Sequence, residues 1–365
     1  MNLSRREFIK SAGTAAIAAS ALPAGAALEA FGVTVAFVGL DHIHTPQYLN
    51  AAYRHPGVRI KYLWDEDPSR VKAQAGQVGA TVPEQIETIW SDPEVQGVVI
   101  LSETDRHKAL VLAAARAGKG MFVEKPLGIN PEECADMVVA VEKAGVTFTT
   151  GYFMRTDPMH LFLKDEVAKG HFGTISRVWA SNCHNGSLAG FFDHDWQWMA
   201  DPKRAGVGAF GDLGTHKLDI LMWIFGDVEK VTGLIEPVTH RYGDCDESGE
   251  ALLQFKSGLA GSLAAGWVDI EDPVKLLISG TEGHAVIFRG QLFYRSLHLP
   301  GSSGQKPWQD FPKGPDEPID QFLNTLAGSK DQPLVSIQDA ASRVNVMSTI
   351  YAAAASGRWL KVPPV

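Results

Sequence analysis

Cysteine is scarce in this chain and forms no paired motif. The 365 residues contain three cysteines, Cys134, Cys183 and Cys245, with no Cys-x-x-Cys spacing among them. Disulfide-stapled domains and structural zinc sites use closely spaced cysteines. We therefore expect neither, and we expect the three thiols to be ordinary buried or partly buried side chains.

The sequence also lacks a long run of basic residues. Beyond its N-terminal region, it lacks an apolar run of the roughly 18 residues that a membrane-spanning helix needs. The formal net charge is −9. Nucleic acids and anionic membranes attract basic surfaces, so we expect no nucleic-acid partner and no integral membrane protein. The expected ligand is a small molecule.

The first thirty residues have the order of a secretory signal. The pair Arg5-Arg6 precedes a small-residue, weakly apolar stretch over 11–22, and Ala24-Gly25-Ala26 offers a cleavage site. The segment around Arg5-Arg6 resembles the twin-arginine motif. The alternative, an amphipathic helix, would require a polar face that this stretch does not have. We expect a periplasmic protein exported through the twin-arginine pathway, which carries folded proteins.

Short apolar runs alternate with helical stretches after this signal. The helical stretches are 46–54, 109–117 and 131–144. The apolar runs are 33–39, 58–64, 97–101, 120–123 and 146–149. Continuous apolar runs are typical of parallel strands buried on both faces. The alternation predicts an α/β fold with an N-terminal doubly wound parallel sheet of the Rossmann type.

Two residues at the ends of these runs indicate a dinucleotide. Gly39 ends the first run and Asp65 ends the second, and ligands bind beyond the carboxyl ends of such strands. A carboxylate at the second end can accept hydrogen bonds from the ribose of NAD and repels the 2′-phosphate of NADP. We therefore expect NAD, with NADP disfavoured. Asp65 can also cap the helix that follows Pro68, and both roles are compatible.

Only the first glycine of the G-x-G-x-x-G fingerprint is present. The segment from Gly39 to His44 reads GLDHIH, so Asp41 replaces the glycine that lets pyrophosphate approach the backbone. Contacts with the phosphates must then differ in detail, although the helix N-terminus still offers N–H groups. We place His42 or His44 near substrate or pyrophosphate.

Two further segments resemble the Gfo/Idh/MocA family of oxidoreductases. The first is Val123-Glu124-Lys125-Pro126, at the end of the fourth apolar run. The second is the glycine-rich segment 206–219, which contains Asp-x-Gly-x-His-x-x-Asp from Asp212 to Asp219. The C-terminal run 336–363 is a third match. The resemblance spans about residues 33–363 and implies a redox enzyme that binds a nicotinamide cofactor and a sugar.

The resemblance also implies roles for individual residues. Lys125, Asp212 and His216 would form the catalytic set, because oxidising an alcohol needs a base and a positive charge beside the developing alkoxide. Structural roles for His216 and Asp212, in a helix and as its cap, are the alternatives. The residues assigned to the cofactor are Gly39, Asp41, His42, Asp65, Thr104, His107, Glu124 and Lys125.

The pattern changes after residue 150. Glycine-separated strands at 175–182, 230–235, 250–255, 258–266 and 274–279 predict an α+β domain with a large, mostly antiparallel sheet. We expect four parts: a signal peptide over 1–30, the Rossmann domain over 31–150, a substrate and oligomerisation domain over 151–335, and a C-terminal helix and tail over 336–365 that pack back on the body. The resemblance implies a homodimer or homotetramer, although Trp267, Ile270 and Leu276 can equally be core residues.

A polar and aromatic loop precedes the second family segment. Sugar sites combine flat apolar surfaces with hydrogen-bonding side chains, and the loop over 182–201 offers both. The residues that we assign to a carbohydrate substrate are Tyr152, Arg155, His184, Asp193, His194 and Trp198. The alternative is a solvated loop that its tryptophans anchor to the core.

A metal site is a weaker alternative in the same sequence. His42 and His44, with Asp193 or His194, would offer mixed nitrogen and oxygen ligands. We favour a site without a metal.

Several functions remain open at this stage. The leading hypothesis is an exported oxidoreductase that transfers hydride from a sugar or sugar derivative to tightly held NAD. Alternatives are an NAD-dependent glycoside hydrolase or lyase that uses transient oxidation, and transfer of hydride between two sugars. A non-catalytic nucleotide- or sugar-binding regulator is a further alternative, which the presence of Lys125 and His216 disfavours.

The signal assignment predicts where a variant will accumulate. Replacing Arg5-Arg6 by Lys-Lys should leave the protein in the cytoplasm, because the paired guanidinium groups define the motif. Fractionation of cells that express both forms measures this. Undiminished export of the variant would refute the assignment.

Overall fold

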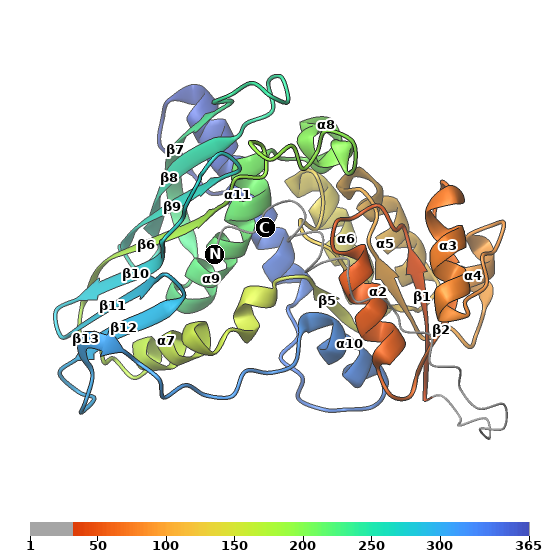
Figure 1. Cartoon of the computed structure of the whole chain (residues 1–365), viewed down its shortest axis with the longest axis horizontal. Helices are drawn as coiled ribbons and strands as arrows, with labels where there is room; N and C mark the ends of the chain where they lie inside the picture. The colour runs from red at the N-terminus through yellow and green to blue at the C-terminus, as the bar shows by residue number, and fades with distance from the viewer. Residues whose placement is uncertain (1–31, 365) are drawn as a thin grey trace. The chain divides into compact units, whose positions relative to one another are not determined.

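The computed structural model of the chain describes residues 32–364, which fall into two compact units (Figure 1). Unit 1 comprises 32–151 and 316–341, and unit 2 comprises 152–315 and 342–364. The expected signal peptide over 1–30 lies outside the described residues. Among residues 32–364, no helix combines the length and apolar character needed to cross a membrane.

Unit 1 is built on a five-stranded, fully parallel sheet, as the alternating pattern predicted. The strand order is β2-β1-β3-β4-β5. The strands are β1 (Val33–Val38), β2 (Val58–Trp64), β3 (Gly97–Ile100), β4 (Gly120–Val123) and β5 (Phe148–Thr150). All residues of β3, β4 and β5 are buried, which explains their continuous apolar sequences.

The helices of unit 1 cover the sheet and include one from late in the chain. They are α2 (Thr45–Arg54), α3 (Ser69–Val78), α4 (Glu87–Ser91), α5 (His107–Arg116), α6 (Pro131–Ala144) and α10 (Pro318–Leu326), with the 3-10 helix η1 (Thr104–Arg106). Phe322 of α10 packs against Phe122 in the core of unit 1. The structure thus assigns 316–341 to unit 1, whereas we expected the second domain to continue to residue 335.

Gly39 is a glycine because the backbone there leaves no room for a side chain. Its φ is +73°, and a Cβ atom would lie 2.4 Å from the Cβ of Ser102. The Gly39 N–H bonds the Trp64 carbonyl, and the His42 N–H bonds the Leu101 carbonyl. The loop after β1 is therefore held against the ends of β2 and β3.

Unit 2 contains a nine-stranded sheet, ordered β13-β12-β11-β10-β6-β9-β8-β7-β14. The strands are β6 (Ile175–Cys183), β7 (Val228–Glu236), β8 (Ser248–Phe255), β9 (Ala260–Gly266), β10 (Val274–Gly280), β11 (Gly283–Phe288), β12 (Gln291–Ser296), β13 (Ser303–Pro307) and β14 (Leu360–Lys361). Only β6 and β9 pair in parallel, which confirms the prediction of a large, mostly antiparallel sheet.

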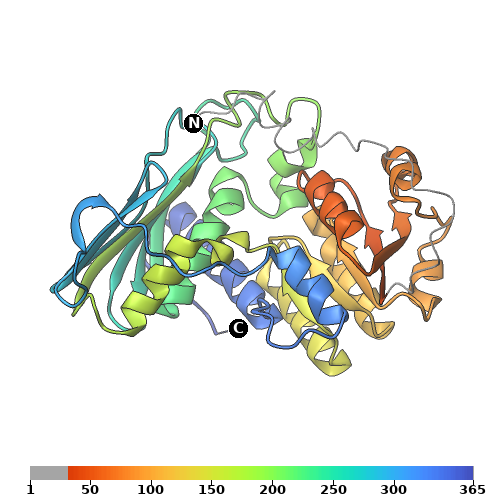
Figure 2. The same cartoon turned by 60° about the horizontal axis from the view of Figure 1, so that its bottom comes forward.

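Helices lie along one face of this sheet (Figure 2). They are α7 (Pro158–Ala168), α9 (Ala209–Phe225) and the later turns of α11 (Ile337–Ser356). Unit 2 also contains the short helix α8 (Pro202–Ala205) and the 3-10 helices η2 (Phe153–Thr156) and η3 (Gln197–Ala200). Leu218 and Leu221 of α9 are fully buried in the core of unit 2. Trp267 and Leu276 are also buried, whereas Ile270 is 71% exposed. The expected pairing of subunits through this sheet stays a prediction.

A buried ion-pair triad fixes α9 within unit 2. The carboxylate of Asp219 is fully buried and accepts two hydrogen bonds from Arg155, at 2.8 and 2.6 Å. Its Oδ1 also accepts one from Nε of Arg343 at 2.9 Å. The triad joins η2, α9 and α11, so it locks the helix that carries the second family segment.

This triad predicts a large stability difference between two aspartate variants. Asp219→Ala leaves two largely buried guanidinium groups without their carboxylate, which typically costs about 3–5 kcal/mol of unfolding free energy. Asp227→Ala removes only an exposed ion pair with Lys256 and should change it by less than about 1 kcal/mol. Urea denaturation compares the two. Equal effects would show that the triad does not stabilise unit 2.

Candidate functional site

The carboxyl ends of β1, β2 and β3 surround a pocket in unit 1. Its wall includes Gly39, Asp65, Arg70 and Glu103, and Leu110 contributes apolar surface. This is the edge where parallel α/β sheets bind ligands. The pocket combines an apolar surface with carboxylates at a strand end, which suits the adenosine portion of a dinucleotide.

Asp65 is buried and already bonded to the loop after β1. Its Oδ2 accepts the Leu40 N–H at 2.7 Å, and its Oδ1 accepts the Asp67 N–H at 2.9 Å. Only 5% of the residue is exposed. Asp65 therefore fixes the loop in addition to the ribose contact that the sequence predicts.

Arg70, which the sequence analysis did not single out, connects the acidic residues of this pocket. Its guanidinium lies 3.0 Å from Asp41, 3.1 Å from Asp65 and 3.4 Å from Glu103. Burial alone would lower the pKa of Arg70, but Asp41 and the neighbouring carboxylates raise it. Arg70 lies in the first turn of α3, five residues after Asp65. This short spacing is the feature of the sequence from which their contact could have been predicted.

Thr104 and His107 lie beside the end of β3, and both are buried. Nδ1 of His107 lies 3.1 Å from the Pro126 carbonyl, and Nε2 lies 3.3 Å from the Ser102 carbonyl. Burial lowers the pKa of His107. The ring thus connects the segments that follow β3 and β4. The assignment of Thr104 and His107 to the cofactor stays a prediction.

Glu124 collects several contacts at the end of β4. Its Oε1 lies 2.7 Å from Nδ1 of His44 and 3.7 Å from Nδ1 of His42, and its Oε2 accepts the Lys125 N–H at 2.6 Å. Glu124 is fully buried. Burial would raise its pKa, but His42, His44 and Lys125 hold the pKa well below its usual range. The metal alternative combined His42 and His44 with Asp193 or His194. The structure instead places Glu124 beside the two histidines.

Lys125 occupies the position that its motif predicts. It is the second residue after β4, so it lies at the carboxyl edge of the sheet, and only 3% of the residue is exposed. Its backbone is anchored by Glu124. The ammonium group therefore extends from a fixed point on the ligand-binding edge of unit 1.

In unit 2, the N-terminus of α9 is held by two side chains from distant segments. Asp246 accepts the Phe210 N–H at 2.8 Å, and the Tyr351 hydroxyl accepts the N–H groups of Gly208 and Gly211 at 3.2 and 3.0 Å. These contacts satisfy amide groups that a helix start leaves without partners. They set the position of the first turn, which contains Asp212.

Asp212 and His216 lie four residues apart on α9, as the motif predicted. Oδ2 of Asp212 accepts a hydrogen bond from Nε1 of the buried Trp267 at 3.3 Å. The His216 ring lies 4.9 Å from the Phe153 ring, centroid to centroid. A carboxylate and an imidazole on one helix face suit an oriented acid–base pair.

Four of the six predicted substrate residues are buried or bonded to other parts of the protein. Tyr152 is buried, and its hydroxyl lies 2.9 Å from Oγ1 of Thr215. Arg155 is paired with Asp219, and Trp198 is only 4% exposed. Nδ1 of His184 accepts the Gly186 N–H at 2.9 Å. These contacts give Tyr152, Arg155 and His184 structural roles, and the burial of Trp198 fits the alternative in which tryptophans anchor the loop to the core.

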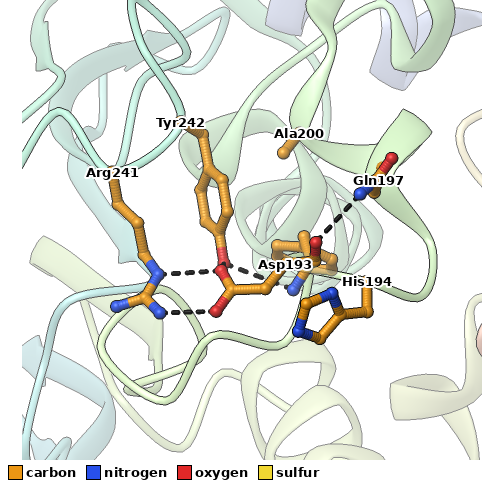
Figure 3. Close-up of a pocket in the computed structure, with 7 residues that line it drawn as sticks. Asp193, His194, Gln197, Ala200, Arg241 and Tyr242 are labelled. Atoms are coloured by element: carbon orange, nitrogen blue, oxygen red, sulfur yellow. Dashed lines mark hydrogen bonds and ion pairs between the residues drawn. The ribbon is translucent and has the colours of Figure 1, made fainter.

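Asp193 and His194 line an open pocket of about 510 Å³ in unit 2 (Figure 3). Arg241 binds the Asp193 carboxylate through two hydrogen bonds, at 2.9 and 2.6 Å, and the Tyr242 hydroxyl donates to it at 3.2 Å. Arg241 lowers the pKa of Asp193. Sequence analysis missed Arg241 and Tyr242, because they come from the connection between β7 and β8.

The catalytic set predicted from the sequence is divided between the units. Lys125 belongs to unit 1, and Asp212 and His216 belong to unit 2. Within unit 1, the structure brings Asp41 and Asp65 together through Arg70.

Comparisons with known proteins support this assignment of the two units. Residues 33–152 match the model of an oxidoreductase family with an NAD-binding Rossmann fold, GFO/IDH/MocA, and residues 160–286 match the GFO/IDH/MocA C-terminal domain. The scyllo-inositol 2-dehydrogenase (NAD(+)) of Bacillus subtilis is 26% identical over 280 residues, which is 74% of this chain and 78% of that protein.

Further relatives extend the comparison. The myo-inositol 2-dehydrogenase of Thermotoga maritima is 32% identical over 177 residues, which is 47% of this chain and 49% of that protein. A solved structure of levoglucosan dehydrogenase, in complex with NADH and levoglucosan, has a TM-score of 0.77 at 21% identity and covers 91% of this chain and 100% of that one. It shows the shared fold. The two family models together span more than half of the 365 residues, and the chain therefore belongs to the Gfo/Idh/MocA family of oxidoreductases, with an NAD-binding Rossmann domain.

Proposed function

We propose that this protein is an exported oxidoreductase that oxidises a hydroxyl group of a sugar or polyol with tightly held NAD. The observation that carries the proposal is that Lys125, Asp212 and His216 are all present at their motif positions in a chain that matches both family domains. Relatives named as inositol dehydrogenases support a polyol or sugar as the substrate class.

The proposed chemistry divides one alcohol oxidation among these side chains. The bound nicotinamide supplies the acceptor for the hydride that leaves carbon. His216 accepts the hydroxyl proton, and Asp212, four residues earlier on the same helix, is the second group of the acid–base pair. The Lys125 ammonium stabilises the negative charge that develops on the substrate oxygen.

Arg70 has a role in this proposal because the phosphate-binding loop is acidic. Asp41 stands where a glycine normally admits the pyrophosphate, and Asp65 and Glu103 add negative charge nearby. These carboxylates would repel an anionic dinucleotide. Arg70 offsets that repulsion. We therefore infer that Arg70 restores part of the affinity for the dinucleotide that is lost when Asp41 replaces the glycine.

Arg70→Met should therefore weaken the binding of NAD and ADP-ribose by about 10–100-fold, since a hydrogen bond to a charged group contributes about 1.5–3 kcal/mol. Adenosine, which carries no phosphate, should lose much less. Adding Asp41→Asn should restore part of the affinity, because it removes a carboxylate charge that Arg70 compensates in the parent protein. Calorimetric titration measures all three ligands.

A matched control exists for this series. Arg59→Met removes a surface arginine paired with Glu94 and should leave the affinity for NAD unchanged. Equal losses for adenosine and NAD in Arg70→Met would contradict the electrostatic role.

The proposed location determines how the cofactor must be used. The Arg5-Arg6 signal directs a folded protein out of the cytoplasm, into a compartment where free NAD should be scarce. A cofactor that dissociated there would be lost, so retention requires a Kd far below the free concentration. We therefore infer that NAD is bound before export and is regenerated in place, by a second sugar or by a later step on the same substrate.

Purification of the mature protein from the periplasm tests this directly. After denaturation, the released nicotinamide should approach one equivalent per chain. Lys125→Met and His216→Asn should retain this NAD but lose about 10²–10⁴ in rate on a sugar that the parent turns over, which is the usual contribution of a positioned acid–base group.

Exposed residues supply the controls: Lys256→Met and His298→Asn should behave as the parent protein. Protein that is active but free of cofactor, and that reduces added NAD stoichiometrically, would contradict retention and indicate an ordinary dehydrogenase. Near-normal turnover of Lys125→Met or His216→Asn would remove that residue from the catalytic set.

A further inference from the structure

Two imidazole rings converge on one buried carboxylate oxygen at the carboxyl edge of the unit 1 sheet. Nδ1 of His44 lies 2.7 Å from Oε1 of Glu124, and Nδ1 of His42 lies 3.7 Å from the same atom. The three potential ligand atoms all lie within 4.8 Å of one another. His42 and Glu124 are buried, and the His44 side chain is 25% exposed.

We propose that His42, His44 and Glu124 form a binding site for a divalent transition-metal ion. Two imidazole nitrogens and one carboxylate oxygen suit Zn²⁺, Fe²⁺, Co²⁺ or Mn²⁺, whereas Ca²⁺ and Mg²⁺ prefer oxygen ligands alone. Bonds of about 2.1 Å place the ligand atoms of a tetrahedral site about 3.4 Å apart. The three ligand atoms, which lie within 4.8 Å of one another, would therefore close by up to about 1.4 Å.

The carboxylate is supported from its outer side in the way that metal ligands usually are. Oε2 of Glu124 accepts the Lys125 N–H at 2.6 Å, and the Tyr48 hydroxyl also bonds this carboxylate. The Tyr48 ring in turn packs edge-on against His44. Such outer contacts fix a ligand's orientation before the ion arrives.

The local charge favours a cation at this position. A fully buried carboxylate loses its hydration and needs cationic or hydrogen-bonding partners in exchange. His42, His44 and Lys125 are its partners in this structure and hold the pKa of Glu124 well below its usual range. A divalent ion would compensate Glu124 directly, and three protein ligands would leave a position open for an exchangeable oxygen ligand.

Binding has to displace two existing interactions. Nδ1 of His44 can coordinate an ion only in the tautomer that carries its proton on Nε2, and the ion must replace the backbone N–H of His44, which lies 3.2 Å from Nδ1 of His42. Binding should weaken as the pH falls, because protonated imidazole cannot coordinate a metal.

The chain contains a matched pair for comparison. Nδ1 of His171 lies 2.8 Å from Oε2 of Glu166, almost the same separation as in the His44–Glu124 pair, and Lys169 contacts this carboxylate. This pair belongs to no three-ligand cluster among the described residues. His171→Ala therefore removes an equivalent hydrogen-bonded histidine without touching the proposed site.

The test is a metal titration of the full chain, made metal-free by dialysis against a chelator. Zn²⁺ is followed by calorimetry, and Co²⁺ is followed by its visible absorption. We expect one ion per chain. His44→Ala and Glu124→Gln should weaken binding by at least the roughly 10–100-fold that follows loss of a supporting contact, and His171→Ala should bind as the parent does.

Two results would overturn the proposal. One is the absence of saturable binding near one equivalent, which would make the cluster a hydrogen-bonded histidine–carboxylate pair only. The other is binding that survives both variants, which would place the ion elsewhere. Thermal unfolding checks that each variant folds. If Glu124→Gln does not fold, the partly exposed His44→Ala decides the question alone.

Discussion

Burial of carboxylates is the constraint on which the arrangement of this chain depends. Asp65, Glu124 and Asp219 are at most 5% exposed, so each must replace its hydration with donors or cations. Their partners come from other segments: Leu40 and Arg70 for Asp65, His44 for Glu124, and Arg155 and Arg343 for Asp219. Each carboxylate therefore joins parts of the chain that packing of apolar side chains alone would not align, and Glu124 and Asp219 lie within family motifs.

The fold was predictable where one periodicity continued over a whole element. The five parallel strands of unit 1 were read from continuous apolar runs, because burial on both faces requires them. The strands β13 and β14 of unit 2 were not predicted, because they are short and mostly exposed. The assignment of α10 to unit 1 was also not predicted from the sequence. Its strongly amphipathic pattern predicts a buried face, but such a pattern does not state which of two cores receives Phe322.

Some residues of the candidate site could likewise be predicted from the sequence, and others could not. Asp65, Glu124 and Lys125 could be placed because strand ends in a parallel sheet meet at one edge. The Arg70 cluster and the contact between His44 and Glu124 could not, because they depend on the path of loops over that edge. Arg241 reaches Asp193 from 48 positions away, and no local pattern predicts such a pairing.

The incomplete glycine fingerprint follows from what each glycine does physically. Gly39 is retained because its positive φ and its 2.4 Å approach to Ser102 exclude any side chain. The other two fingerprint positions serve close approach of phosphate and packing of the helix, and here they hold Asp41 and His44. Each new side chain acquires a partner, Arg70 for Asp41 and Glu124 for His44. The loop is therefore held by side-chain contacts where glycines would have allowed close backbone approach, and under the proposed function part of nucleotide recognition would depend on charge in place of shape.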